Sequence, residues 1–262
     1  MNQVVVKQEK SGYQIVEAYK SLRTNLQFCG EDKKIIAITS CTPNEGKSSV
    51  SMQLGISLAE IGKRVILIDA DLRKSVLLGR TKTEKSVRGL AHFLTGQASL
   101  EDVICSTNVK NFYMIYSGPF PPNPAELLGG KNFRSLLIAL RKVYDYVIVD
   151  TPPVNPVIDG ALIAKKCDGT VLVVECGTTD RGQAVKAKKQ LDYAGVRILG
   201  VVLNKIGLNK KGGYGYGYGY GYGYGYGYGY GEKKARAEVK SKKKDNKAKK
   251  STTARDKKRT RA

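Results

Sequence analysis

The sequence has little with which to build a metal centre or a disulfide framework. Its five cysteines are scattered, and none of their spacings is typical of a metal site or of paired thiols. An odd number of such cysteines fits reduced thiols in a cytosolic protein. The single histidine, His92, lies in an apolar stretch. We interpret it as a packed or surface residue rather than a catalytic one.

Long apolar segments are also missing. No apolar run approaches the roughly 20 residues that cross a bilayer as a helix, and the start of the chain does not have the pattern of a signal peptide. We therefore expect an intracellular protein, whose attachment to a membrane comes through a partner or through its basic end.

Positive charge gathers at the C-terminal end. Residues 232–262 carry 15 Lys and Arg against 4 Asp and Glu, which is half of the chain's net charge of +22. Such a segment is too polar to bury apolar surface, and we expect it to be disordered. It can attract anionic lipid or nucleic acid, and a purely solvating extension is an equal alternative.

Just before that segment the chain alternates strictly between tyrosine and glycine. Alternate glycines prevent a packed core, so we expect a flexible string of phenols. One interpretation is an adhesive segment in which tyrosines stack, and the other is a set of accessible hydroxyl groups that accept phosphate in a nucleotide site. The nine candidate phosphoacceptors are Tyr214, Tyr216, Tyr218, Tyr220, Tyr222, Tyr224, Tyr226, Tyr228 and Tyr230.

Residues 40–49 have the layout of a phosphate-binding loop. They follow an apolar run, contain Gly-Lys-Ser, and precede residues with helical spacing. In such a loop backbone N–H groups and the start of the helix bind phosphates, Lys47 neutralises their charge, and Ser48 binds Mg²⁺. Cys41 stands where the usual pattern has glycine, so the motif alone is incomplete. The residues expected to contact the nucleotide here are Pro43, Asn44, Glu45, Gly46, Lys47, Ser48 and Ser49.

Two further aliphatic runs end in carboxylates. One leads into Asp69 and Asp71, and the other leads into Asp150. Runs of this kind are typical of strands buried on both faces of a parallel sheet, and ligands bind at the carboxyl ends of such strands. Acids beside a phosphate loop need a cation to offset their charge. We therefore expect Asp69 and Asp150 to hold Mg²⁺ with Ser48, directly or through water, and strand alternation points Asp69 and Asp71 the same way.

The alternation of strands and helices predicts an α/β fold, a doubly wound and mainly parallel sheet of the P-loop NTPase type. Asn123 before Pro124 predicts a capped helix start. Asn204 ends the last strand, where it can meet a nucleotide base or be an ordinary polar terminus.

Helices are expected over 13–28, 89–94, 100–104, 158–166 and 180–194, and the remaining strands over 112–116, 169–175 and 198–205. We divide the chain into an N-terminal helical arm (1–30), a P-loop domain (31–211), the Tyr-Gly tail (212–231) and a basic disordered extension (232–262).

Taken together, these motifs resemble those of the bacterial tyrosine kinases of capsular and exopolysaccharide synthesis, in the short form without a fused membrane activator. The resemblance extends from about Glu17 to Lys205. It rests on the phosphate loop, on Ile-Asp-Ala-Asp-Leu-Arg at 68–73 and on the strand that ends at Asp150. Asn-Pro-Ala-Glu-Leu-Leu at 123–128 and the C-terminal tyrosines complete it.

The resemblance implies an ATP-dependent protein-tyrosine kinase that autophosphorylates its tyrosine tail, mostly between neighbouring subunits. It implies a ring of subunits, octameric in related proteins, in which Glu17, Lys20 and Arg23 make contacts. It also implies a separate membrane-embedded activator of the polysaccharide co-polymerase type, a cognate tyrosine phosphatase, and a cytoplasmic location at the inner face of the membrane. Protein substrates and, through the basic end, anionic lipid are further expected partners, whereas nucleic acid is not expected.

The same resemblance assigns catalytic roles. Lys47 and the loop amides would stabilise charge on the transferred group, with Asp150 arranging the metal. One of Asp69 and Asp71 would accept or orient the tyrosine proton; the sequence does not decide between them, and we favour Asp69. Arg73 would orient the acidic turn or contact a neighbouring subunit.

Two alternatives compete with the kinase. A partitioning or division-site ATPase of the same broad group carries a second lysine where this chain has Thr42. A nonenzymatic scaffold with a basic nucleic-acid-binding or lipid-binding tail would not need the intact set of Lys47, Ser48, Asp69 and Asp150.

Overall fold

The computed structural model describes residues 2–7, 12–83 and 86–207. The predictions for the Tyr-Gly tail and for the basic extension lie outside the described residues. Within these residues, no helix is both long enough and apolar enough to cross a membrane.

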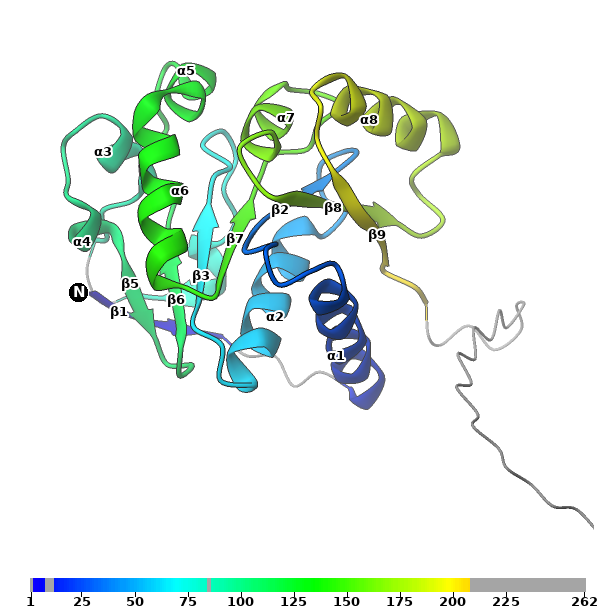
Figure 1. Cartoon of the computed structure of the whole chain (residues 1–262), viewed down its shortest axis with the longest axis horizontal. Coiled ribbons are helices and arrows are strands. Elements are labelled where there is room, and N and C mark those ends of the chain that lie inside the picture. The colour runs from blue at the N-terminus through cyan, green and yellow to red at the C-terminus, as the bar shows by residue number, and fades with distance from the viewer. Residues whose placement is uncertain (1, 8–11, 84–85, 208–262) are drawn as a thin grey trace, which may run out of the picture. The chain divides into compact units, whose positions relative to one another are not determined.

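Nine strands form one sheet in the described part of the chain, in the order β4-β1-β5-β6-β3-β7-β2-β8-β9 (Figure 1). All neighbours from β6 to β9 are parallel, whereas β5 is antiparallel to β6 and β4 to β1. The strands are β1 (Asn2–Val6), β2 (Ile35–Ser40), β3 (Val65–Asp69), β4 (Thr81–Lys82), β5 (Cys105–Thr107), β6 (Phe112–Ile115), β7 (Tyr146–Asp150), β8 (Gly169–Glu175) and β9 (Ile198–Asn204).

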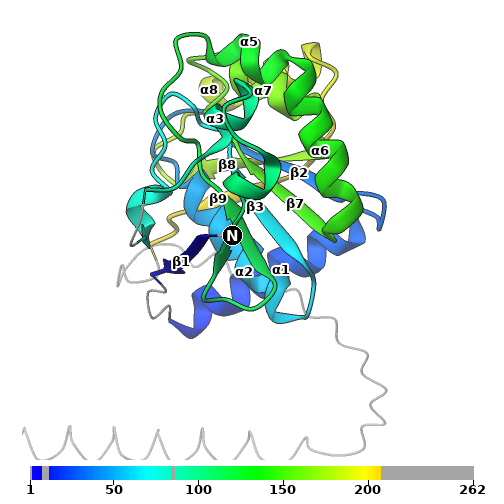
Figure 2. The same cartoon turned by 90° about the vertical axis from the view of Figure 1, so that its left-hand side faces the viewer.

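Helices cover both faces of this sheet (Figures 1 and 2). One apolar core packs α1 and α2 against one face, and two others pack α3 to α8 against the opposite face. This arrangement confirms the predicted doubly wound, mainly parallel fold. The helices are α1 (Tyr13–Phe28), α2 (Lys47–Glu60), α3 (Leu90–Leu94), α4 (Leu100–Val103), α5 (Pro124–Gly129), α6 (Lys131–Val143), α7 (Asp159–Ala164) and α8 (Arg181–Tyr193), with a 3-10 turn at Leu78–Arg80.

The three strands that carry the predicted motifs lie side by side. In β2, β3 and β7 every residue is buried, because helices cover both faces, and this explains their continuous aliphatic sequences. Asp69 and Asp150 are direct register partners at the ends of β3 and β7, and Ile38 of β2 pairs with Asp150. The phosphate loop and both acidic strand ends therefore meet at one edge of the sheet.

Some predictions need correction. The first 30 residues are not wholly helical, since residues 2–6 form β1, which pairs with β5 inside the sheet. Asn123 makes no side-chain cap at the start of α5, and its amide nitrogen donates a hydrogen bond to Glu126 Oε2 at 2.8 Å. Strand β3 ends at Asp69, so strand alternation does not set the direction of Asp71.

Candidate functional site

The loop between β2 and α2 turns sharply at Gly46. This glycine has φ 92°, a conformation that residues with a Cβ rarely adopt. A Cβ at this position would lie 2.1 Å from Asn204 Nδ2. Gly46 is therefore required both by the backbone and by the close approach of β9. Cys41, at the usual glycine position, is fully buried and belongs to the apolar core under α7 and α8.

The end of β9 and the segment after β8 hold this loop in place. Asn204 Nδ2 donates to the Glu45 carbonyl at 2.9 Å, and Lys205 Nζ donates to the Asn44 carbonyl at 2.7 Å. The buried Glu45 carboxylate accepts hydrogen bonds from the Thr42 N–H and the Thr179 hydroxyl. Asn204 thus contacts the loop itself in this structure, and its contact with a base stays a prediction.

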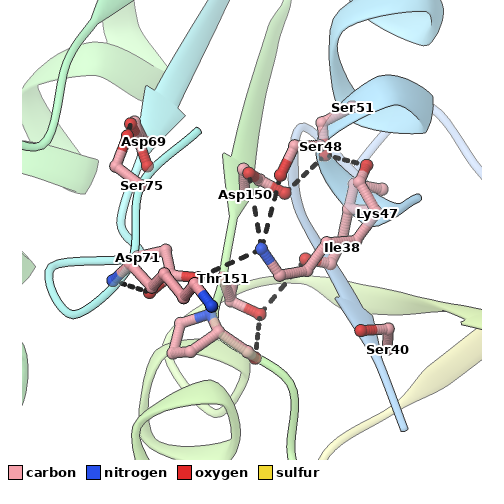
Figure 3. Close-up of polar contacts among 12 residues, drawn as sticks. Ile38, Ser40, Lys47, Ser48, Ser51, Asp69, Asp71, Ser75, Asp150 and Thr151 are labelled. Carbon is pink, nitrogen blue, oxygen red and sulfur yellow. Dashed lines mark hydrogen bonds and ion pairs between the residues drawn. The ribbon is translucent and has the colours of Figure 1, made fainter. Parts of the chain in front are cut away.

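Lys47 lies among acids at the centre of the site (Figure 3). Its Nζ is 3.1 Å from Asp71 Oδ2 and 3.9 Å from Asp150 Oδ2, and it donates to Ser48 Oγ at 3.3 Å. Burial lowers the pKa of Lys47, but Asp150 and Asp71 raise it more, so that its pKa lies above the ordinary value. The lysine is therefore charged and paired with these carboxylates.

Asp150 is buried at the end of β7, the strand next to β2. The loop that leads to Lys47 follows β2. Asp150 accepts a hydrogen bond from Ser51 Oγ at 3.0 Å, and Ser51 lies one turn into α2. Burial raises the pKa of Asp150 more than Lys47, Ser48 and Ser51 lower it. A cation at this position would remove the burial penalty on the charged carboxylate.

Asp69 lies apart from the Lys47 group, beside Ser75 (Figure 3). Ser75 donates a hydrogen bond to Asp69 Oδ2, whereas the buried Oδ1 has no hydrogen-bond partner among the described residues. Burial, together with the charge of Asp150, raises the pKa of Asp69 to about 7. The structure therefore brings Asp71 and Asp150 to Lys47, and leaves Asp69 as the acid with an unused oxygen.

A cleft of about 420 Å³ is lined by Lys47, Ser48 and Asp71, whereas the buried Asp69 and Asp150 lie behind its lining residues. Its walls are the phosphate loop, the turn after β3 and the proline-rich segment after β7. In the described residues no three His, Cys, Asp or Glu side chains are grouped as a ready metal site. The residues lining the cleft include Pro43, Asn44, Gly46, Lys47, Ser48, Ser49, Asp71, Arg73, Lys74, Val76, Arg80 and Pro156.

The three charged residues predicted for subunit contacts have different surroundings on α1. Glu17 and Lys20 form an exposed ion pair at 2.8 Å. Arg23 instead donates to the Ser57 carbonyl at 2.7 Å and to Ser57 Oγ at 3.1 Å. Arg23 therefore fastens α1 to α2 within the same chain, whereas the other two remain on the surface.

Several site residues were not predicted from the sequence. Ser51 donates a hydrogen bond to Asp150 and Ser75 donates one to Asp69. Arg80 Nη1 donates to Ser49 Oγ at 2.6 Å. Asp159, at the start of α7, binds Arg73. For Ser51 a signal existed, since it lies four residues after Lys47 and so on the same face of α2.

Comparison with known proteins gives these motifs a family. A model of the AAA domain matches residues 33–181. The tyrosine-protein kinase CpsD of Streptococcus agalactiae is 45% identical over 190 residues, which is 72% of this chain and 83% of that protein.

Solved structures agree with the sequence comparison. The kinase domain of the Escherichia coli tyrosine kinase ETK superposes with a TM-score of 0.71 and 36% identity, covering 78% of this chain and 80% of that one. The septum site-determining protein MinD of Pyrococcus horikoshii, complexed with Mg-ADP, is more distant, with a TM-score of 0.56 and 26% identity over 68% of this chain and 72% of that one. The chain belongs to the bacterial tyrosine-protein kinases, and its P-loop is a nucleotide-binding site.

Proposed function

We propose that this kinase uses ATP with Mg²⁺ to phosphorylate tyrosines of its own C-terminal tail, between neighbouring subunits, and thereby regulates capsular or exopolysaccharide synthesis and export. One observation carries the proposal. Lys47 is buried at the end of a glycine turn and held at 3.1 Å by Asp71, beside Asp150. A charged amine placed this way is preorganised to receive the β- and γ-phosphates.

Each group in the cleft has a role in this proposal. The loop from Pro43 to Ser49 binds the triphosphate through its backbone N–H groups, and Lys47 stabilises charge on the transferred group. The Ser48 hydroxyl and Asp150 would hold Mg²⁺, directly or through water, and the ion would supply positive charge to offset that of the phosphates. Asp69, which we expected as a further ligand, lies beside Ser75 and is given a proton-accepting role instead. Asn204 lies at the end of the loop where a base can reach it.

Asp69 is the better candidate to accept the tyrosine proton. Asp71 is engaged on both oxygens, since Oδ2 faces Lys47 and Oδ1 accepts from the N–H groups of Arg73 and Lys74. Asp69 keeps Oδ1 without a partner in the described chain, and its pKa of about 7 suits a base that works near neutral pH.

The proposed partners are supported by the same family assignment. We propose a homo-oligomeric ring in which the exposed Glu17 and Lys20 face of α1 contacts a neighbour, with an octamer as the expected size. A separate membrane-embedded activator and a tyrosine phosphatase complete the system, and residues 232–262 can add contact with anionic lipid. Residues 1–30, 31–211, 212–231 and 232–262 remain our proposed functional divisions.

Incubation with labelled ATP and Mg²⁺, followed by phosphotyrosine detection, tests the central claim. We expect labelled tyrosine in the wild type, and label at background in Lys47→Met and in a variant with all nine tail tyrosines changed to Phe. Full labelling of Lys47→Met would show that another site performs the transfer. Label that persists in the all-Phe variant would move the phosphoacceptors away from the tail.

The rival functions predict other results in the same assay. A division-site type ATPase would release phosphate without phosphotyrosine, and a scaffold would do neither. Mixing Lys47→Met carrying an intact tail with the active all-Phe variant tests transfer between subunits. Label on the Lys47→Met chain is the expected result, because its own site is inactive.

A further inference from the structure

Asp159 is a buried carboxylate that lies just outside the cleft. It begins α7 and is fully buried. Both of its oxygens face one guanidinium, since Arg73 Nε donates at 2.6 Å and Nη2 at 3.2 Å. A buried carboxylate is stable only when its charged partner is well placed. Asp159 therefore holds the guanidinium of Arg73 in one position.

Arg73 joins this anchor to the catalytic acids. Its side chain lines the cleft, and its backbone N–H donates to Asp71 Oδ1 at 3.3 Å. Lys74 N–H donates to the same oxygen at 3.0 Å. The turn that holds one oxygen of Asp71 is thus tied through Arg73 to Asp159, while the other oxygen of Asp71 faces Lys47.

The anchor itself stands on a tightly packed support. Gly160, next to Asp159, approaches the segment after β7 so closely that a Cβ there would lie 2.6 Å from the Pro152 carbonyl oxygen. The same carbonyl accepts a hydrogen bond from Thr39 Oγ1 of β2 at 3.0 Å. The start of α7 is therefore fixed to the strands that carry the phosphate loop and Asp150.

We propose that Asp159 is a positioning residue for phosphoryl transfer, which acts by holding Arg73 and through it the turn that carries Asp71. The inference rests on the proposed roles of Lys47 and Asp71. Asp159 touches neither nucleotide nor tyrosine in this account. It keeps Asp71 at the distance where Lys47 is aimed at the transferred phosphate, and a misplacement of about 1 Å at such a site can lower the rate a hundredfold.

The neutral variants Asp159→Asn and Arg73→Gln test this. We expect each to lower kcat for tyrosine phosphorylation at least tenfold while KM for ATP stays within about twofold, because the phosphate loop is held by other contacts. The double variant should be no slower than the slower single variant, since both remove one shared interaction. Thermal melting of each protein gives the folded fraction to which kcat is normalised.

The ion pair of Arg141 with Asp168 supplies a matched control. Its N–O distance is also 2.6 Å, and the Arg141 side chain is 39% exposed, as is that of Arg73. This pair joins α6 to the start of β8, away from the cleft. Arg141→Gln should therefore lower the melting temperature to a similar extent and leave kcat unchanged.

Three outcomes overturn the proposal: a folded Arg73→Gln protein with wild-type kcat, additive losses in the double variant, or an equal loss of kcat in Arg141→Gln. If Asp159→Asn fails to fold, Arg73→Gln decides alone, because its side chain is partly solvent-exposed. Lys47→Met separates this result from failure of the proposed function. If Lys47→Met is inactive while Arg73→Gln is fully active, only the positioning role of Asp159 is wrong.

Discussion

Replacing Asp69 with asparagine should make the nucleotide-free protein more stable and the kinase inactive. Asp69 is buried, its Oδ1 has no partner among the described residues, and its pKa is raised from 3.8 to about 7 by burial and by the charge of Asp150. A carboxyl group whose pKa is higher in the folded state binds more protons there than in the unfolded chain. It therefore lowers stability as the pH rises through this interval.

The size of the effect follows from the pKa values. Each tenfold change in proton affinity corresponds to about 1.4 kcal/mol, so that full ionisation of Asp69 costs the folded state about 4 kcal/mol above pH 7 as an upper limit. Near pH 4 the cost is below about 1 kcal/mol, because the carboxyl is protonated in the folded state and partly protonated in the unfolded one. Asparagine does not ionise, and its amide oxygen can still accept the hydrogen bond from Ser75.

Urea unfolding followed by circular dichroism at pH 4 and pH 8, without nucleotide or Mg²⁺, checks this. The Asp69→Asn variant should gain up to about 4 kcal/mol over the wild type at pH 8 and little at pH 4. Asp71→Asn is the control, and should lower stability by about 1–3 kcal/mol at pH 8 because it removes a partner of buried Lys47. An advantage of Asp69→Asn that is equal at both pH values, or a loss at pH 8, would refute the reasoning.

Three further predictions concern the loop and the first helix. Gly46→Ala should abolish ATP binding in titration calorimetry, because φ 92° and the contact with Asn204 leave no room for a methyl group. Thr179→Val should lower the free energy of unfolding by about 1–3 kcal/mol and weaken ATP binding, since it removes a hydrogen bond to the buried Glu45 carboxylate. Glu17→Lys breaks an exposed ion pair, and such pairs contribute little to stability. It should leave thermal melting unchanged and shift the sedimenting species to smaller mass, and an unchanged mass would remove Glu17 from the subunit interface.

Most of the fold could be predicted because its central strands carry a strong local signal. Strands β2, β3 and β7 are buried on both faces, and so each is a continuous aliphatic run followed by the polar residues of the site. The strands that were not predicted are the short β1, β4 and β5 on one side of the sheet. β1 pairs with β4 and β5, which lie about 80 to 100 positions away, and nothing in a few local residues indicates such a partner. β4 and β5 have only two and three residues, too few to show a periodic pattern, although β5 also pairs with the nearby β6.

The candidate site, like the fold, could be predicted only in part. Lys47, Ser48 and the acids at strand ends belong to local motifs, and their meeting at one sheet edge follows from parallel strands. The contacts of Asp159 and Thr179 join segments 86 and 134 residues apart, so that only the folded chain shows them. The distinction between Asp69 and Asp71 was also beyond the sequence, because it depends on which carboxylate Lys47 reaches.

The structure also connects α1 and the end of β9 to the phosphate loop through few contacts. Arg23 of α1 is bonded to Ser57 of α2, and α2 begins at the loop's own lysine. Near the C-terminal end of the described residues, Asn204 and Lys205 donate hydrogen bonds to loop carbonyls. In the sequence, the tyrosine tail follows these residues. A displacement of α1 would therefore reach the phosphate loop through one helix, α2. A displacement of Asn204 and Lys205 would reach it through one pair of hydrogen bonds. Coupling over so few contacts requires no larger movement of the sheet, whose central strands are fully buried between helices.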